Sequence, residues 1–203
     1  MSRQQRRTER VRGRTPRYAG GRALRQRFLI VCEGEETETN YFRAFQVPGL
    51  VVRGVARQAD RLIEEAVELA RRSEYDQVWC VFDQDDCSGE QVQTAYNLAR
   101  RHGYKIAFSN QAFELWYLLH FHYFNTSLTR RHYVDRLSQL LGRPYSKNTE
   151  TIYAELISRQ PEAIRNAARL SGIYNAQMPP HDCDPSTTVH LLVEELNKYR
   201  RPD

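Results

Sequence analysis

Short apolar runs alternate with amphipathic segments along the first half of the chain. Runs rich in β-preferring residues predict buried strands at 27–32, 78–82 and 104–108, with a weaker candidate at 50–55. Between them lie segments with the apolar spacing of a helix face, at 37–45, 60–72 and 90–101. Alternation of strand and helix predicts an α/β fold with a mostly parallel, Rossmann-like sheet flanked by helices.

The second half of the chain predicts mainly helices. An apolar segment at 110–121 is expected to begin at a cap formed by Ser109 or Asn110. Further helices are expected at 128–142, 149–158, 161–171 and after a cap at Ser186 or Thr187. The predicted organisation is a flexible arm over 1–26, an α/β core over 27–124 and a helical C-terminal extension over 125–203 that packs on the core.

Charge is distributed unevenly. Residues 1–27 carry ten arginines and one glutamate, a net charge of +9, which leaves −4 on the remainder because the whole chain is +5. Arginine binds phosphate in a bidentate way, so this arm predicts contact with nucleic acid. A solubilising tail and a surface for an acidic protein are the alternatives. The candidate nucleic-acid-binding residues are Arg3, Arg6, Arg7, Arg10, Arg12, Arg14 and Arg17.

The composition predicts where in the cell the protein is located and the state of its cysteines. No apolar run approaches the roughly 18 residues that span a bilayer, and no leader pattern is present, so we expect a cytoplasmic protein without membrane contact. The four cysteines show no CxxC pairing, and Cys32 and Cys80 lie in predicted strands. They are interpreted as reduced, packed thiols.

Acidic residues follow two of the predicted strands. Asp83, Asp85 and Asp86 come directly after the strand at 78–82, and Glu33 follows the strand at 27–32. The carboxyl ends of parallel strands meet at one edge of a sheet, so Glu33, Asp83 and Asp85 are expected to lie together. Carboxylates that converge on one point repel unless a cation or a proton lies between them. The pattern therefore predicts a metal site.

Other polar residues are weaker candidates. Glu114 is the lone acid of an apolar helix, which favours a further ligand, although an exposed position or an arginine partner also explains it. The nearby acids Glu35, Glu36 and Glu38 are explained by the start of a helix, for which Thr37 is the predicted N-cap, and need no function. The histidines at 120, 122 and 132 are interpreted as surface residues or partners of a helix C-terminus, with metal ligation as the alternative. The loop at 181–184, with its histidine, cysteine and aspartates, is interpreted as a turn, with a metal cluster as the alternative.

Several other site chemistries fit less well. The strand followed by Asp83 and Asp85 resembles the aspartate-nucleophile phosphatases of the haloacid dehalogenase class, but Cys87 stands where that class has Thr or Val. The chain has no GxxxxGK[ST], GxGxxG or GxSxG motif, which argues against nucleotide-binding loops and serine hydrolysis.

The pattern is most similar to the Toprim architecture of topoisomerases, primases and the overcoming-lysogenization-defect nucleases. LIVCEG at 29–34 and VFDQD at 81–85 resemble its Glu and Asp-x-Asp motifs in order and spacing. Four segments together resemble the RloB family, which is found beside restriction and abortive-infection genes in bacteria. These segments are VCEGEETETNYF at 31–42, FDQDD at 82–86, SNQAFELW at 109–116 and PSTTV at 185–189. Gln111 and Asp184 depart from the family's usual Pro and Asn.

The resemblance implies a Toprim-like core that binds Mg²⁺ or Mn²⁺, with Glu33, Asp83, Asp85 and Glu114 as catalytic metal ligands. It implies a nuclease that hydrolyses DNA or RNA in anti-phage defence, with an ATPase as partner protein and with oligomerisation left open. Oxygen ligands favour the same hard cations over zinc, and a Glu33 that binds no ion is an alternative general base. The alternative function is a non-catalytic nucleic-acid-binding or ATPase-regulating subunit of a defence system.

Overall fold

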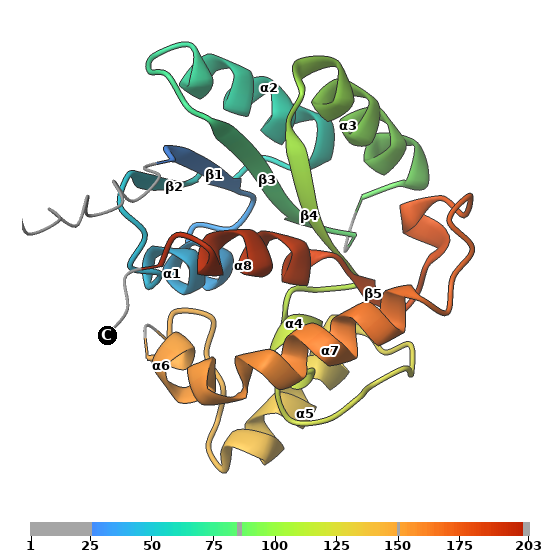
Figure 1. Ribbon diagram of the computed structural model, residues 1–203. Helices are drawn as coiled ribbons and strands as arrows, with labels where there is room; N and C mark the ends of the chain where they lie inside the picture. The colour runs from blue at the N-terminus through green and yellow to red at the C-terminus, as the bar shows by residue number, and fades with distance from the viewer. Residues whose placement is uncertain (1–25, 85–86, 150, 201–203) are drawn as a thin grey trace, which may run out of the picture.

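A five-stranded sheet forms the centre of the protein (Figure 1). The computed structural model describes residues 26–84, 87–149 and 151–200. The strand order is β2-β1-β3-β4-β5, and only the pairing of β4 with β5 is antiparallel. The predicted α/β fold with a mostly parallel sheet is therefore confirmed. The strands are β1 (Phe28–Cys32), β2 (Leu50–Gly54), β3 (Gln77–Asp83), β4 (Lys105–Asn110) and β5 (Ser186–Thr187).

Alternating side chains of the strands supply two apolar layers. In β1, Phe28, Ile30 and Cys32 face one core, while Leu29 and Val31 face the other. The second core is closed by the helices α2 (Ala59–Ala70) and α3 (Gly89–His102). The first is closed by α1 (Thr37–Arg43), α8 (Val189–Asn197) and the helices between β4 and β5. Helices thus cover both faces of the sheet, as a buried parallel sheet requires (Figure 1).

The C-terminal half packs on the α1 side of the sheet. Its elements are α4 (Glu114–Leu118), α5 (Arg130–Leu141), α6 (Ile152–Leu156), the 3₁₀ turn η1 (Ile157–Arg159), α7 (Gln160–Ser171) and the 3₁₀ turn η2 (Pro180–Asp182). Residues beyond 125 share the larger core with β1 and β3 and add β5 to the sheet. The division at residue 124 stays a prediction. In the part of the chain that the structure describes, no helix is both long and apolar enough to cross a bilayer.

The structure corrects the predicted helix at 110–121. Ser109 and Asn110 belong to β4, and the helix is only the short α4, whose preceding residue is Phe113. Ser109 is unavailable as a cap because its hydroxyl is hydrogen-bonded to the Thr187 hydroxyl, 3.0 Å away, across the pairing of β4 with β5. Competition from the sheet therefore shortens the helix.

Two other predicted caps are also wrong. Residue 36, not Thr37, precedes α1, and the Thr37 hydroxyl instead donates to the Lys147 carbonyl at 3.4 Å. At the last helix, Ser186 and Thr187 form β5, and Thr188 precedes α8. The Thr187 hydroxyl contacts the Ser109 hydroxyl across the sheet at 3.0 Å, and it also accepts a hydrogen bond of 3.3 Å from the Val189 N–H at the start of α8.

Candidate functional site

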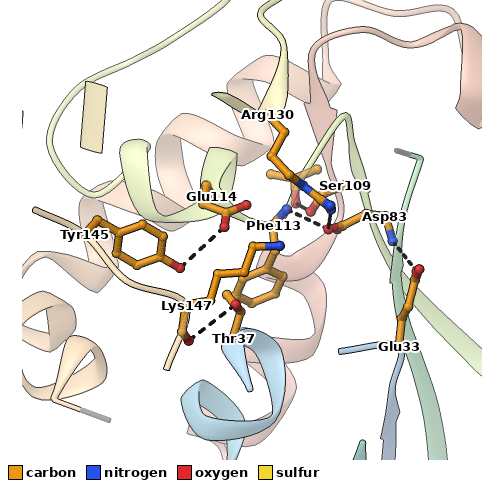
Figure 2. Close-up of polar contacts among 10 residues, drawn as sticks. Glu33, Thr37, Asp83, Ser109, Phe113, Glu114, Arg130, Tyr145 and Lys147 are labelled. Carbon is orange, nitrogen blue, oxygen red and sulfur yellow. Dashed lines mark hydrogen bonds and ion pairs between the residues drawn. The ribbon is translucent and has the colours of Figure 1, made fainter. Parts of the chain in front are cut away.

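A pocket of about 380 Å³ lies at the carboxyl edge of β1 and β3. This is the edge at which open α/β sheets bind ligands. The charged side chains that line it and matter most here are Glu33, Glu38, Asp83, Glu114, Arg130 and Lys147. Figure 2 shows acids from the sheet and cations from the C-terminal half facing this space.

Glu33 is the first residue after β1 and is half-buried. Its backbone N–H donates to the Val81 carbonyl at 2.9 Å, so the pairing with β3 continues one step beyond the strand. Its Oε2 accepts a hydrogen bond of 3.3 Å from the backbone N–H of Asp83 (Figure 2). The structure therefore brings Glu33 and Asp83 together, 50 positions apart in the sequence.

Asp83 ends β3 and is only 3% exposed. Its Oδ2 accepts hydrogen bonds from the Phe113 backbone N–H at 3.1 Å and from Arg130 Nη2 at 3.2 Å. Its Oδ1 is buried and has no hydrogen-bond partner among the described residues. A buried carboxylate oxygen without a partner is costly, so this atom is suited to binding a ligand.

Glu114 is the first residue of α4 and is 2% exposed. It lies on the same pocket as Glu33 and Asp83, and its Oε1 accepts a hydrogen bond of 3.5 Å from the Tyr145 hydroxyl. The side chain is thus buried in the site and not turned to solvent. Asp85 and the seven candidate arginines of the arm lie outside the described residues.

Glu38 is a functional candidate that the sequence analysis missed. It lies in the first turn of α1, yet it is 6% exposed and lines the pocket. Its carboxylate packs against Gly34 so closely that a Cβ at position 34 would overlap it. An acid at the start of a helix is explained by the helix dipole, so it does not point to a function. The only signal in the sequence was weak: Gly34, which follows Glu33 directly, leaves room for the Glu38 carboxylate.

Arg130 and Lys147 supply the positive charge of the pocket. Arg130 is the first residue of α5, and Lys147 lies in the loop between α5 and α6. Thr37 fixes this loop, since its hydroxyl donates to the Lys147 carbonyl (Figure 2). No local pattern distinguishes either cation in the sequence, because only the fold brings them to the acids.

Burial and neighbouring carboxylates raise the pKa of two acids of the pocket, Glu38 and Asp83. Burial, followed by the charges of Glu114 and Glu33, raises the pKa of Glu38 from 4.5 to about 7. Burial, and then Glu38 and Glu114, raises the pKa of Asp83 well above its usual range, while Arg130 opposes this shift. The pocket thus holds more negative charge than its own cations balance, and a bound cation would relieve the repulsion.

The donor set fits a hard divalent cation. It consists of carboxylate oxygens, which suit Mg²⁺ or Mn²⁺ and not zinc, and it includes the unpartnered Oδ1 of Asp83. Within the described ranges, however, no three His, Cys, Asp or Glu side chains are already arranged closely enough to hold an ion. Arg130 Nη2 lies 3.2 Å from Oδ2 of Asp83, so a positive side chain already contacts one oxygen of this acid.

The histidines lie elsewhere. The expected surface position of His120 is wrong, because the side chain is buried and its Nδ1 donates to the Trp116 carbonyl at 2.9 Å. Burial lowers the pKa of His120 to about 4, so its ring is neutral near pH 7. His132 is exposed on α5, with its Nδ1 2.9 Å from the Thr129 hydroxyl. Neither residue lines the acidic pocket.

Comparisons with known proteins give one positive result. Neither the curated proteins nor the solved structures contain a significant match to the chain. The family described as RloB-like protein matches residues 28–196, from the first residue of β1 to the residue before the last of α8. The acidic pocket lies within the matched range. The chain belongs to the RloB-like protein family.

Proposed function

We propose that the protein is a metal-dependent nuclease that hydrolyses phosphodiester bonds of DNA or RNA. The observation that carries this proposal is the pocket at the carboxyl edge of the sheet, where Glu33, Asp83 and Glu114 meet two cationic side chains. Metal-assisted phosphoryl transfer requires carboxylates that bind a hard metal ion and positively charged side chains that bind the phosphate. This pocket has side chains of both kinds.

Glu33, Asp83 and Glu114 would hold the ion, and Asp85 is the proposed further ligand. Mg²⁺ or Mn²⁺ bound there would polarise the phosphodiester and activate the attacking water. The Phe113 N–H holds Asp83 in place, and the Tyr145 hydroxyl orients Glu114, so the ligands are positioned before substrate binds. The burial of Asp83 and Glu114 excludes bulk water from that side of the reacting group.

The wider setting is also a proposal. The restriction and abortive-infection genes that accompany the RloB family support a proposed role in bacterial anti-phage defence. The proposed location is the cytoplasm, and the proposed partner protein is an ATPase, as the resemblance to related nuclease systems implies. The arginines of residues 1–17 would hold the phosphate backbone without selecting a sequence.

A non-catalytic subunit is the second candidate. The ion pair between Arg130 and Asp83 favours it, because a carboxylate already paired with an arginine has an explanation that needs no metal. In that case the fold would bind nucleic acid or regulate an ATPase without cleavage.

The test is cleavage of plasmid DNA and of RNA by the purified full chain in Mg²⁺ or Mn²⁺. We expect Asp83→Asn and Asp83→Ala to lower the rate by at least about 100-fold while the fold is retained. Asp135→Ala is the matched control, since Asp135 is an exposed aspartate of α5 that does not line the pocket. Cleavage that persists in both Asp83 variants would refute the proposed site, and inactive wild-type protein would favour the non-catalytic subunit.

A further inference from the structure

We propose that Arg130 exchanges partners: it binds Asp83 in the cation-free protein and turns to a substrate phosphate when a cation occupies Asp83. This inference rests on the proposed function, because it assigns a positioning role within the same site. Its starting point is the contact of 3.2 Å between Arg130 Nη2 and Asp83 Oδ2. That contact places a positive side chain on the acid that is central to the proposed metal site.

The Arg130 and Asp83 side chains differ in how much they can move. The Asp83 side chain is 4% exposed and the Arg130 side chain 32% exposed. Asp83 is fixed by its strand and by the Phe113 N–H, whereas Arg130 begins a helix and has a long side chain with access to solvent. When the pair separates, Arg130 is therefore the residue that moves.

Electrostatic repulsion would separate Arg130 from Asp83 when a cation binds. A divalent cation on Asp83 would lie within a few ångströms of the guanidinium, and like charges at that distance repel strongly in a partly buried site. The cation has another position available on the same carboxylate, because Oδ1 has no hydrogen-bond partner in the described part of the chain. Binding of the ion would therefore weaken the hold of Asp83 on Arg130.

Lys147 indicates which ligand the Arg130 guanidinium would bind when its contact with Asp83 weakens. It lines the same pocket and forms no ion pair with any of the described residues. Its side chain extends toward the space between Glu114 and Asp83 (Figure 2). Arginine binds a phosphate through two parallel hydrogen bonds, and lysine binds it as a point charge. Together they would bind a backbone phosphodiester, which carries no base sequence.

Two binding measurements on the full chain test the exchange without requiring turnover. In Arg130→Gln we expect Mn²⁺ to bind about fivefold more tightly by calorimetry, because a competing cation is gone. We expect the affinity for a short fluorescent oligonucleotide in Ca²⁺, checked on a gel to be intact, to fall about tenfold. Arg131→Gln is the matched control, as an exposed arginine next in α5 that does not line the pocket, and should change neither value.

Arg130→Lys covers the case in which the Gln variant does not fold. This variant keeps the positive charge but loses the bidentate geometry of arginine. We therefore expect weaker binding of the oligonucleotide and no weakening of Mn²⁺ binding. The exchange is refuted if Arg130→Gln matches Arg131→Gln in both measurements, or if Arg130→Lys binds the oligonucleotide like wild type. If Arg130→Gln binds Mn²⁺ more tightly and the oligonucleotide more weakly, but the wild-type protein cleaves no nucleic acid, the exchange is supported and the proposed nuclease activity is rejected. If neither affinity changes in Arg130→Gln, but the wild-type protein cleaves nucleic acid, the exchange is rejected and the nuclease activity is supported.

Discussion

The acidic and basic sides of the pocket are built in different ways. Glu33 and Asp83 stand at the ends of two neighbouring strands, so their separation is set by backbone pairing. Arg130 and Lys147 come from a helix start and a loop in the C-terminal half, where long side chains span the remaining distance. The rigid side suits metal ligands, which tolerate little displacement, and the adaptable side suits a phosphate that must enter and leave.

The largest expected effect is a division of kinetic roles between the two sides. Glu114→Gln should lower kcat by about 100-fold or more with little change in KM, because it removes a ligand of the proposed ion. Lys147→Gln should raise KM by about tenfold with little change in kcat. Steady-state cleavage assays of both variants measure this division. The reverse distribution would contradict the assignment of the acids to chemistry and of the cations to binding.

Two buried groups should give opposite pH dependences of stability. The raised pKa of Glu38, about 7, means that folding favours its protonated form, so stability falls as pH rises from about 4.5 to 7. The lowered pKa of His120, about 4, means that stability falls as pH drops from about 6.5 to 4. Each effect amounts to about 3 kcal/mol at most.

Denaturant unfolding in EDTA at a series of pH values separates the two groups. Glu38→Gln should gain stability over wild type as the pH rises, and His120→Phe should gain as the pH falls. Parallel curves for wild type and Glu38→Gln would show that the acidic side of the pocket carries no electrostatic cost.

Close packing behind the acids should produce the next effect. A Cβ at Gly54 would lie 2.6 Å from Glu35 Cα and 2.8 Å from the Gly34 carbonyl oxygen, both backbone atoms that cannot move aside easily. Gly54→Ala should therefore destabilise the protein by about 1–3 kcal/mol. Gly172→Ala is the control, since its Cβ would meet nothing closer than 3.4 Å, and it should be neutral. Equal melting temperatures would mean that the loop after β1 adapts.

The smallest effect concerns positive charge outside the pocket. Removal of residues 1–20 should lower oligonucleotide affinity about tenfold at low salt. It should also make the plot of log affinity against log salt shallower by about 0.7–0.9 for each lost phosphate contact. Cleavage at saturating substrate should be unchanged. An unaltered salt slope would remove the arm from nucleic-acid binding.

The sequence predicted the acidic side of the site far better than the basic side. A run of apolar residues that ends at an acid, as at Cys32–Glu33 and Phe82–Asp83, is a local signal, and the parallel sheet brings such ends together. Arg130 and Lys147 are two among 30 lysines and arginines, and no local pattern distinguishes them. Their role depends on how α5 packs, which is a tertiary property.

The same distinction explains the wrong helix boundaries. The pattern at 110–121 is apolar enough for a long helix, but Ser109 and Asn110 pair with β5, a strand 76 positions further along the chain. Glu38 was explained by local helix electrostatics, while its burial depends on Gly34 and on the C-terminal half. Propensity describes a residue within its segment, and these residues are determined by contacts between segments.

The register of β1 with β3 has a consequence for how this family can change. Cys32 is level with Val81, so one step further Glu33 is level with Phe82, and its carboxylate accepts a hydrogen bond of 3.3 Å from the Asp83 backbone N–H. Slippage by one residue would shift an acid by about 3.3 Å and turn its side chain to the opposite face. Insertions in the segments that connect the strands leave this register unchanged, so they alter the spacing of the two acids less than a change within β1 or β3 does.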